Sequence, residues 1–205
     1  GRAVSVGASG LGLGLARTAI AAGAVTPKGT DAARQTVGGG AAIIAGSCSA
    51  ATLAQIGAVE ERIPVRRLDI GGLIDGGDGI AGAIAWAGDR LADGPVLLAS
   101  SAGPETVAAL RAAHGEAVGA RIEQTLAEIA ADLVARGVRR LIVAGGETSG
   151  AVIDRLGVAA FGIGAEIAPG VPLLHGMGEP AMTFALKSGN FGGADFFSRA
   201  LARMT

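Results

Sequence analysis

The sequence predicts an α/β fold, a doubly wound and mostly parallel sheet with helices on both faces and an antiparallel edge or hairpin near the C-terminus. Three short runs are apolar throughout and alternate with helical segments, at 41–45, 95–99 and 141–144. Strands of this kind are buried on both faces, which is typical of parallel sheets covered by helices. After Gly157 only loops separate the strand-like runs, so the antiparallel edge is expected there.

The pattern of apolar residues predicts each element in turn. An apolar run at 3–6 before a glycine-rich turn predicts a first strand, with a helix to about Ala22. Residues 65–70 alternate polar and apolar side chains, as an outer strand does, and a loop is expected at 71–79. The clearest helix is expected at 116–136, because its apolar residues recur every three or four positions and Gly137 can end it. The other elements expected are a strand at 41–45, a helix to about 61, a helix near 82–92, a strand at 95–99, a strand at 141–144, a helix to about 157, strands at 158–167, 173–174 and 182–186, and a helix at 194–204.

Length and composition favour a single domain over residues 1–205, long enough to bury a substantial core. The net charge of -1, the lack of Tyr and the single Trp disfavour a nucleic-acid partner. The apolar stretches are interrupted before they reach the ~20 residues that a bilayer requires. No secretory signal opens the sequence. A cytoplasmic protein with no membrane partner is therefore expected.

Cysteine and histidine do not indicate a metal or redox centre. The single cysteine, Cys48, can form neither an internal disulfide nor a multi-thiolate zinc site, and is interpreted as an inert, buried side chain. His114 and His175 have no patterned partner and are interpreted as surface residues. The sequence therefore nominates no metal-ligating residue.

Turns that contain glycine and serine follow the predicted buried strands, at 46–49, 100–103 and 145–150. The carboxyl ends of parallel strands meet at one edge of a sheet, where open α/β folds bind ligands. Each turn also begins a helix, whose unpaired N–H groups and dipole attract anions. The sequence therefore predicts a polyphosphate pocket at this edge. It contains no phosphate loop ending in Gly-Lys-Ser/Thr, and the alternate glycines at 10–14 do not make a dinucleotide fingerprint.

Three segments of the second half resemble, in order and spacing, the C-terminal domain of the four-carbon acid sugar kinase family. They are GGETSG at 145–150, APGVP at 168–172 and LKSGNFGG at 186–193, and the turn at 46–49 with Thr52 also fits. The resemblance spans essentially the whole chain. It implies an ATP-dependent kinase of carbohydrate metabolism, a transferase that moves the γ-phosphoryl group of ATP to a hydroxyl of a tetronate-type acid. The implied cofactors are ATP/ADP and Mg2+.

In that family, an N-terminal domain of the same polypeptide holds the sugar acid and precedes the nucleotide-binding domain. The resemblance therefore implies that this chain binds nucleotide but does not phosphorylate the acid alone. Whether the protein forms a homo-oligomer is left open.

The resemblance also implies roles for individual residues. Lys187 would stabilise charge on the transferred group, and Glu147 would either orient magnesium-bound water or stabilise the start of its own helix. No catalytic base is assigned. The implied nucleotide-binding residues are Ser47, Ser49, Gly145, Gly146, Glu147, Thr148, Ser149, Lys187 and Gly189.

Two other functions are compatible with this architecture. A dinucleotide-binding, Rossmann-like oxidoreductase module would need an acidic residue about 20 positions after the first glycine turn. Asp31 is near that distance but lies in a polar segment and not at a strand end. A non-catalytic regulatory module, with purely structural glycine turns, is the second alternative.

Overall fold

The fold is that of a computed structural model, which describes residues 4–7, 9–26, 37–71, 79–115 and 117–204. The chain forms two compact units, residues 1–33 and residues 34–205. Each unit is described by itself. Within the described ranges, no helix has both the length and the apolar character needed to cross a bilayer.

The first unit contains helix α1 (Ser9–Ala21), which confirms the helix expected to about Ala22. The strand expected at 3–6 is wrong for the residues that the structure describes, because residues 4–7 belong to no sheet; Ala3 lies outside those residues. A strand needs a neighbour that pairs with its N–H and C=O groups. Val4 and Val6 are almost fully exposed instead.

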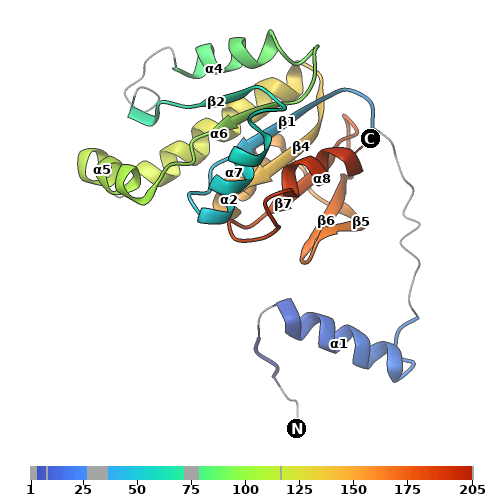
Figure 1. The fold of residues 1–205 in the computed structure, drawn as a ribbon. Helices are drawn as coiled ribbons and strands as arrows, with labels where there is room; N and C mark the ends of the chain where they lie inside the picture. The colour runs from blue at the N-terminus through green and yellow to red at the C-terminus, as the bar shows by residue number, and fades with distance from the viewer. Residues whose placement is uncertain (1–3, 8, 27–36, 72–78, 116, 205) are drawn as a thin grey trace. The chain divides into compact units, whose positions relative to one another are not determined.

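The second unit is built on a seven-stranded sheet with the order β2-β3-β1-β4-β7-β6-β5 (Figure 1). The five strands from β2 to β7 in this order are parallel, whereas β6 pairs antiparallel with β7 and β5 antiparallel with β6. The mostly parallel sheet with an antiparallel edge is therefore confirmed. The strands are β1 (Gly40–Ala45), β2 (Val65–Arg67), β3 (Val96–Ala99), β4 (Val138–Ala144), β5 (Phe161–Ala168), β6 (Val171–Gly176) and β7 (Thr183–Lys187).

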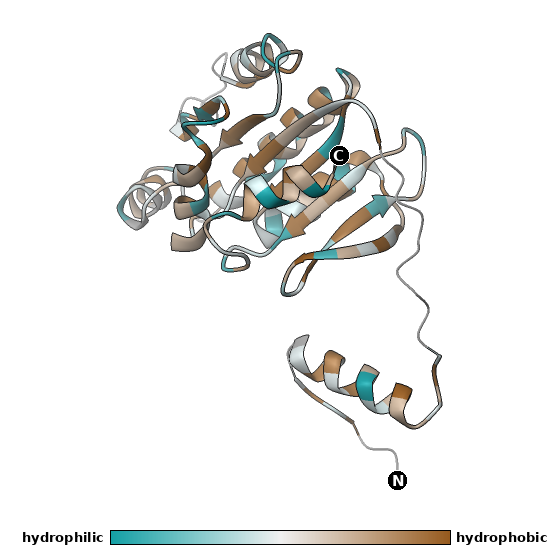
Figure 2. Cartoon of the chain, turned by 45° about the vertical axis from the view of Figure 1, so that its right-hand side comes forward, coloured by the Kyte–Doolittle hydropathy of each residue, from teal (hydrophilic) through white to brown (hydrophobic). Residues whose placement is uncertain are grey.

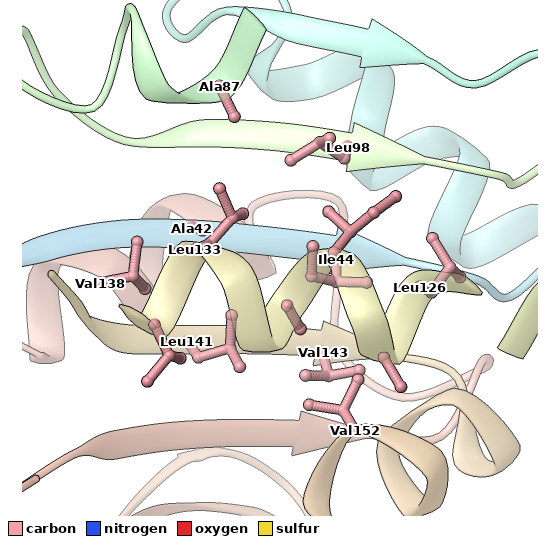
Figure 3. Packing of buried hydrophobic residues seen from close by; sticks show 14 of the residues in the cluster. Ala42, Ile44, Ala87, Leu98, Leu126, Leu133, Val138, Leu141, Val143 and Val152 are labelled. Atoms are coloured by element: carbon pink, nitrogen blue, oxygen red, sulfur yellow. The ribbon is translucent and has the colours of Figure 1, made fainter. Parts of the chain in front are cut away.

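Helices cover both faces of this sheet, because successive side chains of each strand point to opposite sides. Ile44 packs with residues of α4, α6 and α7 on one face (Figure 3), and Ile43 packs with residues of α2 and α8 on the other. The central strands β1 and β3 accordingly consist almost entirely of hydrophobic residues (Figure 2). This arrangement confirms the doubly wound α/β fold. The helices are α2 (Ala50–Val59), α4 (Gly79–Gly88), α5 (Pro104–His114), α6 (Val118–Ala135), α7 (Gly146–Leu156) and α8 (Phe196–Arg203).

The expected elements differ from the structure mainly at their ends. The strand expected at 65–70 ends at Arg67, and it is an outer strand as its alternation indicated. The loop expected at 71–79 lies largely outside the described residues, and Gly79 already belongs to α4.

The central helix α6 provides a test of this packing. Leu133 is fully buried between α6 and the sheet, so the Leu133→Ala substitution should lower the free energy of unfolding by about 2–5 kcal/mol. Urea denaturation of the chain measures this change. Glu128→Ala, at an exposed position of the same helix, should change it by less than about 0.5 kcal/mol. Equal losses in the two variants would contradict this assignment of the core.

Candidate functional site

The five parallel strands end in the same row of the sheet, because Arg67, the last residue of β2, pairs with Ala99 of β3. Ala45 of β1 pairs with Ala99 of β3 and with Ala144 of β4, and Ala144 pairs with Lys187 of β7. The turns that follow these strands therefore start at the same level. The sequence predicted a shared edge for these turns, and the register of the sheet provides it.

A cavity of about 330 Å³ lies at this row of strand ends. The chain leaves β1 toward β2 at one edge of the sheet and leaves β4 toward β5 at the other edge. Open α/β sheets bind ligands in the crevice at such a reversal. The cavity is lined by Gly46, Ser47 and Cys48 after β1, by Ser100 and Ala102 after β3, by Gly145, Gly146, Glu147 and Thr148 after β4, and by Leu110, Val118, Gly119, Ile122 and Glu123 of α5 and α6.

A second cavity, of about 720 Å³, is larger but chemically less suited to an anion. Gly40 at the start of β1 and Gly137 just before β4 place it at the amino ends of the strands. The last residues of α4 and the residue after α6, Arg136, also line it. The carboxyl end of a helix carries partial negative charge, which disfavours a phosphate. The smaller cavity is therefore the better candidate.

Backbone hydrogen bonds hold the turns of the first cavity together. The N–H groups of Gly46 and Ser47 both donate to Ala144 O, at 2.9 and 3.0 Å. The N–H of Gly145 donates to Lys187 O at 2.9 Å. Each turn is thus anchored to the end of a neighbouring strand.

The turn after β4 needs glycine at position 145. Gly145 has φ 134°, a conformation that side chains rarely adopt, and a Cβ there would lie 2.8 Å from Thr148 Oγ1. Gly145 is also the N-cap of α7 and makes no side-chain cap. The first N–H groups of α7 are therefore left for a ligand at the cavity wall. A Cβ on Gly146 would meet no atom within 4 Å, so this residue is open to close approach.

A cluster of hydroxyl groups fixes the turn after β7 beside the turn after β1. Ser49 Oγ donates to Gly189 O at 2.7 Å and, as the N-cap of α2, accepts from the N–H of Thr52 at 3.2 Å. Ser47 Oγ donates to Ser49 Oγ at 3.2 Å. A Cβ on Gly189 would overlap Ser47 Oγ, so glycine allows this close approach.

Lys187 lies beneath this cluster, not in the cavity wall. Its side chain is only 1% exposed, and its Nζ donates to Thr52 Oγ1 at 2.9 Å and to Gly189 O at 2.8 Å. Burial disfavours the charged form and lowers the pKa of Lys187 to about 8. Lys187 thus connects the end of β7 to the start of α2 and supports the turns from below.

Two carboxyl groups lie close together in the wall of the cavity. Glu123 of α6 and Glu147 in the first turn of α7 both line it, and they lie within hydrogen-bonding reach. Burial, and then the charge and hydrogen bond of Glu147, raise the pKa of Glu123 above its ordinary value. The pair can therefore hold a proton or a cation.

The structure brings most of the sequence-predicted residues to this place. Ser47 and residues 145–148 line the cavity, whereas Ser49, Lys187 and Gly189 lie directly behind it. Ser149 Oγ is buried and has no hydrogen-bond partner among the described residues. That these residues contact a nucleotide remains a prediction.

Other residues of the wall were missed or misjudged from the sequence. The interpretation of Cys48 as buried is wrong, because its side chain is exposed and lines the cavity; a glycine-rich turn offers it no cover. Ser100, whose turn was recognised, was not nominated, although its buried Oγ has no partner among the described residues. No local signal marks Glu123, which reaches the site only through the packing of α6 against α7.

The depressed pKa of Lys187 predicts a rise in stability at alkaline pH. Between about pH 8 and 10.5 the unfolded chain holds the Lys187 proton and the folded chain does not, so the free energy of unfolding should increase with pH, by on the order of 3 kcal/mol. Urea denaturation across this range measures the increase. The chain has no Tyr and only one other lysine, Lys28. The same rise in Lys187→Met would contradict the assignment.

The carboxyl pair predicts a coupled titration. In Glu147→Gln the charge beside Glu123 is removed, so the pKa of Glu123 should fall below its value in the parent chain while burial keeps it above the ordinary value. NMR titration of the side-chain carboxyl resonances measures this pKa. Glu128→Gln, on an exposed position of α6, should leave it unchanged. An unaltered pKa in Glu147→Gln would show that the two groups do not interact.

Comparison with known proteins relates the chain to a family of nucleotide-binding domains and to 3-oxo-tetronate kinases. Residues 42–197 match the family model described as "Nucleotide-binding C-terminal domain". A 3-oxo-tetronate kinase of Methylobacterium radiotolerans is 61% identical over 206 residues, which cover 99% of this chain and 49% of that protein. A 3-oxo-tetronate kinase of Cupriavidus necator is 43% identical over 97% of this chain and 46% of its own length. The chain thus spans about half the length of these relatives.

Solved structures share the fold. A Haemophilus influenzae protein superposes with a TM-score of 0.82 at 36% sequence identity. The match covers 95% of this chain and 47% of that protein. A Bordetella bronchiseptica protein was solved with bound citrate as a domain-swapped dimer. It superposes with a TM-score of 0.62 at 25% sequence identity, and the match covers 83% of this chain and 40% of that protein. With the family match over most of its length, the chain belongs to the nucleotide-binding C-terminal domains of the four-carbon acid sugar kinase family.

Proposed function

We propose that this chain is the ATP-binding part of a kinase that transfers the γ-phosphoryl group of ATP to a hydroxyl of a four-carbon sugar acid of the tetronate type. One observation carries the proposal. Three strand-end turns and the uncapped start of α7 surround a single cavity. The names of the relatives, 3-oxo-tetronate kinase, support the choice of reaction.

The wall of the cavity suits a triphosphate. The first N–H groups of α7 and the positive end of its dipole would receive phosphate oxygens. Gly146 would allow the phosphate to approach the backbone, because no side chain intervenes. Ser47 would add a hydroxyl donor from the neighbouring turn after β1. Phosphoryl transfer depends mainly on such positioning and on neutralisation of charge.

The carboxyl pair is suited to a magnesium ion that arrives with the nucleotide. Within the described ranges, no group of three or more His, Cys, Asp or Glu side chains could hold a metal ion alone. Mg2+ commonly binds to one or two carboxylates together with substrate phosphates. Glu123 and Glu147 would supply those carboxylates, and the ion would offset their repulsion of the triphosphate.

Lys187 would act on the nucleotide indirectly. Its ammonium is hydrogen-bonded beneath the turns, so it would keep Gly189 and the start of α2 in place and add a positive potential below the cavity.

The catalytic base and the groups that select the sugar acid are expected in the half of the polypeptide outside this chain. The chain alone would then bind nucleotide without phosphorylating the acid. A kinase that uses ATP is expected in the cytoplasm. Because the Bordetella protein was solved as a domain-swapped dimer, the number of copies that this protein forms in solution should also be measured.

The Gly146→Val substitution tests the phosphate cradle. Valine fits the free chain, since a Cβ at this position meets no atom, but it would block the approach of phosphate. The dissociation constant for ATP, measured by calorimetric titration with Mg2+, should rise about tenfold or more. Gly150→Val is the matched control, because Gly150 lies one turn further along α7, is equally open and is not part of the cavity wall.

Titration with ADP, ATP and NAD, each with and without magnesium, separates this proposal from its alternatives. The kinase proposal predicts binding of ATP and ADP that is tighter with Mg2+. Tight binding of NAD without binding of ATP would favour the oxidoreductase module. Failure of every nucleotide to bind would favour a regulatory module.

A further inference from the structure

The turn after β7, residues 188–193, is held by a row of polar side chains on α2. Ser49, the N-cap of α2, is followed at intervals of three by Thr52 and Gln55, so these side chains lie on one side of the helix. Ser49 Oγ and Thr52 Oγ1 both donate to Gly189 O, at 2.7 and 3.1 Å. Gln55 extends this row to the carbonyl groups at the end of the turn.

Gln55 uses its amide group as a donor only. The side chain is fully buried, and its Nε2 lies 3.1, 3.0 and 3.0 Å from the carbonyl oxygens of Phe191, Gly192 and Gly193. Its Oε1 is also buried but has no hydrogen-bond partner among the described residues. Burying an amide costs free energy unless hydrogen bonds replace those to water. The contacts of the amide nitrogen therefore stabilise the buried side chain, and they tie successive carbonyl groups of the turn to α2.

These contacts fix the direction of the N–H groups in the turn. The peptides of the turn are trans, and in a trans peptide the C=O and the following N–H point in opposite directions. The carbonyl groups of residues 189 and 191–193 are directed toward α2 and Lys187, so the N–H groups of residues 190 and 192–194 point away from them. Within the described ranges these N–H groups have no hydrogen-bond partner. The turn therefore presents free donors on the side opposite to α2.

A contact with the hairpin of β5 and β6 also holds this turn. Gly170, between these two strands, has φ 78°, and a Cβ there would lie 2.6 Å from the ring of Phe191. The ring therefore packs against the backbone of the glycine. The segments at 46–49, 168–172 and 186–193, which the sequence singled out, thus meet at one turn.

We propose that Gln55 is a positioning residue of the nucleotide site, which holds the turn after β7 so that the N–H of Asn190 donates to a phosphate group of the bound nucleotide. Asn190 follows Gly189, whose close approach to Ser47 places this turn beside the cavity. Gln55 does not line the cavity and acts only through the turn. A turn that is held in place before binding loses less conformational freedom when the ligand arrives. This inference rests on the proposed function.

Removal of the donor should weaken nucleotide binding without unfolding the chain. Methionine is of similar length to glutamine but has no N–H group, and the exposed turn can shift so that its carbonyl groups bind water. In Gln55→Met the dissociation constant for ATP with Mg2+, measured by calorimetric titration, should therefore rise about tenfold. In an NMR titration, ATP should shift the backbone amide resonance of Asn190 far less than in the parent chain, while the shift at Gly146 is retained.

A second variant provides the same test with a polar side chain. Gln55→Asn keeps the amide group but is one methylene shorter, so its nitrogen does not reach the carbonyl groups of the turn. It should raise the dissociation constant for ATP in the same direction as Gln55→Met.

Val59→Ala is the matched control. Val59 lies one turn further along α2, is buried in the hydrophobic layer and has no polar atom in its side chain that could bind the turn. The substitution should lower the melting temperature, as the Gln55 variants also do, because it leaves a cavity beneath the same helix. It should nevertheless keep the dissociation constant for ATP within about twofold of the parent value.

Two results would overturn the inference. An unchanged dissociation constant for ATP in both Gln55 variants would show that the turn is positioned without this amide. An equal increase in Val59→Ala would show that binding follows the general stability of α2. In either case the parent chain still binds ATP, whereas a parent chain that does not bind ATP would refute the proposed function itself, so the two failures are distinguishable.

Discussion

The common register of the parallel strand ends is the constraint on which the rest of this site depends. Ala99, Ala45, Ala144 and Lys187 stand in one row across β3, β1, β4 and β7. A slip of one residue would turn every side chain of a strand to the other face of the sheet. Since the two hydrophobic layers fix these faces, packing also fixes the level at which the turns begin.

The turns are then shaped by small residues and held from behind. Gly145 adopts a backbone conformation that other residues rarely adopt, and Gly189 lets the turn after β7 approach the hydroxyls of Ser47 and Ser49. Lys187 provides the support beneath them, at the cost of burying an ammonium group. Hydrogen bonds to Thr52 Oγ1 and Gly189 O offset part of this cost. The part that they do not offset lowers the pKa of Lys187.

The sequence predicted the sheet well because its strands are apolar on both faces and its turns contain glycine and serine. It was less successful where a residue's environment depends on distant packing. The resemblance implied that Lys187 stabilises charge on the transferred group, but its burial below the turns follows only from its pairing within β7 and its hydrogen bond to Thr52 of α2. Glu123 belongs to the site because α6 packs on α7, which no local pattern reveals.

The strand expected at 3–6 illustrates the opposite limit. Its apolar residues and following glycine turn match a strand and helix, and the helix forms, but a strand exists only when a neighbour pairs with it. No such neighbour occurs among the described residues of the first unit. Local sequence can therefore indicate which structure a segment favours without revealing whether a pairing partner exists.

NMR mapping of bound nucleotide would test the central claim most directly, namely that the row of strand ends is the nucleotide site. On titration with ATP and Mg2+, the amide resonances of Gly46 and Gly146 should shift most, while those of Gly40 and Gly137 at the amino ends should not move. Large shifts at Gly40 and Gly137, with Gly46 and Gly146 unmoved, would place the nucleotide in the other cavity and contradict the account.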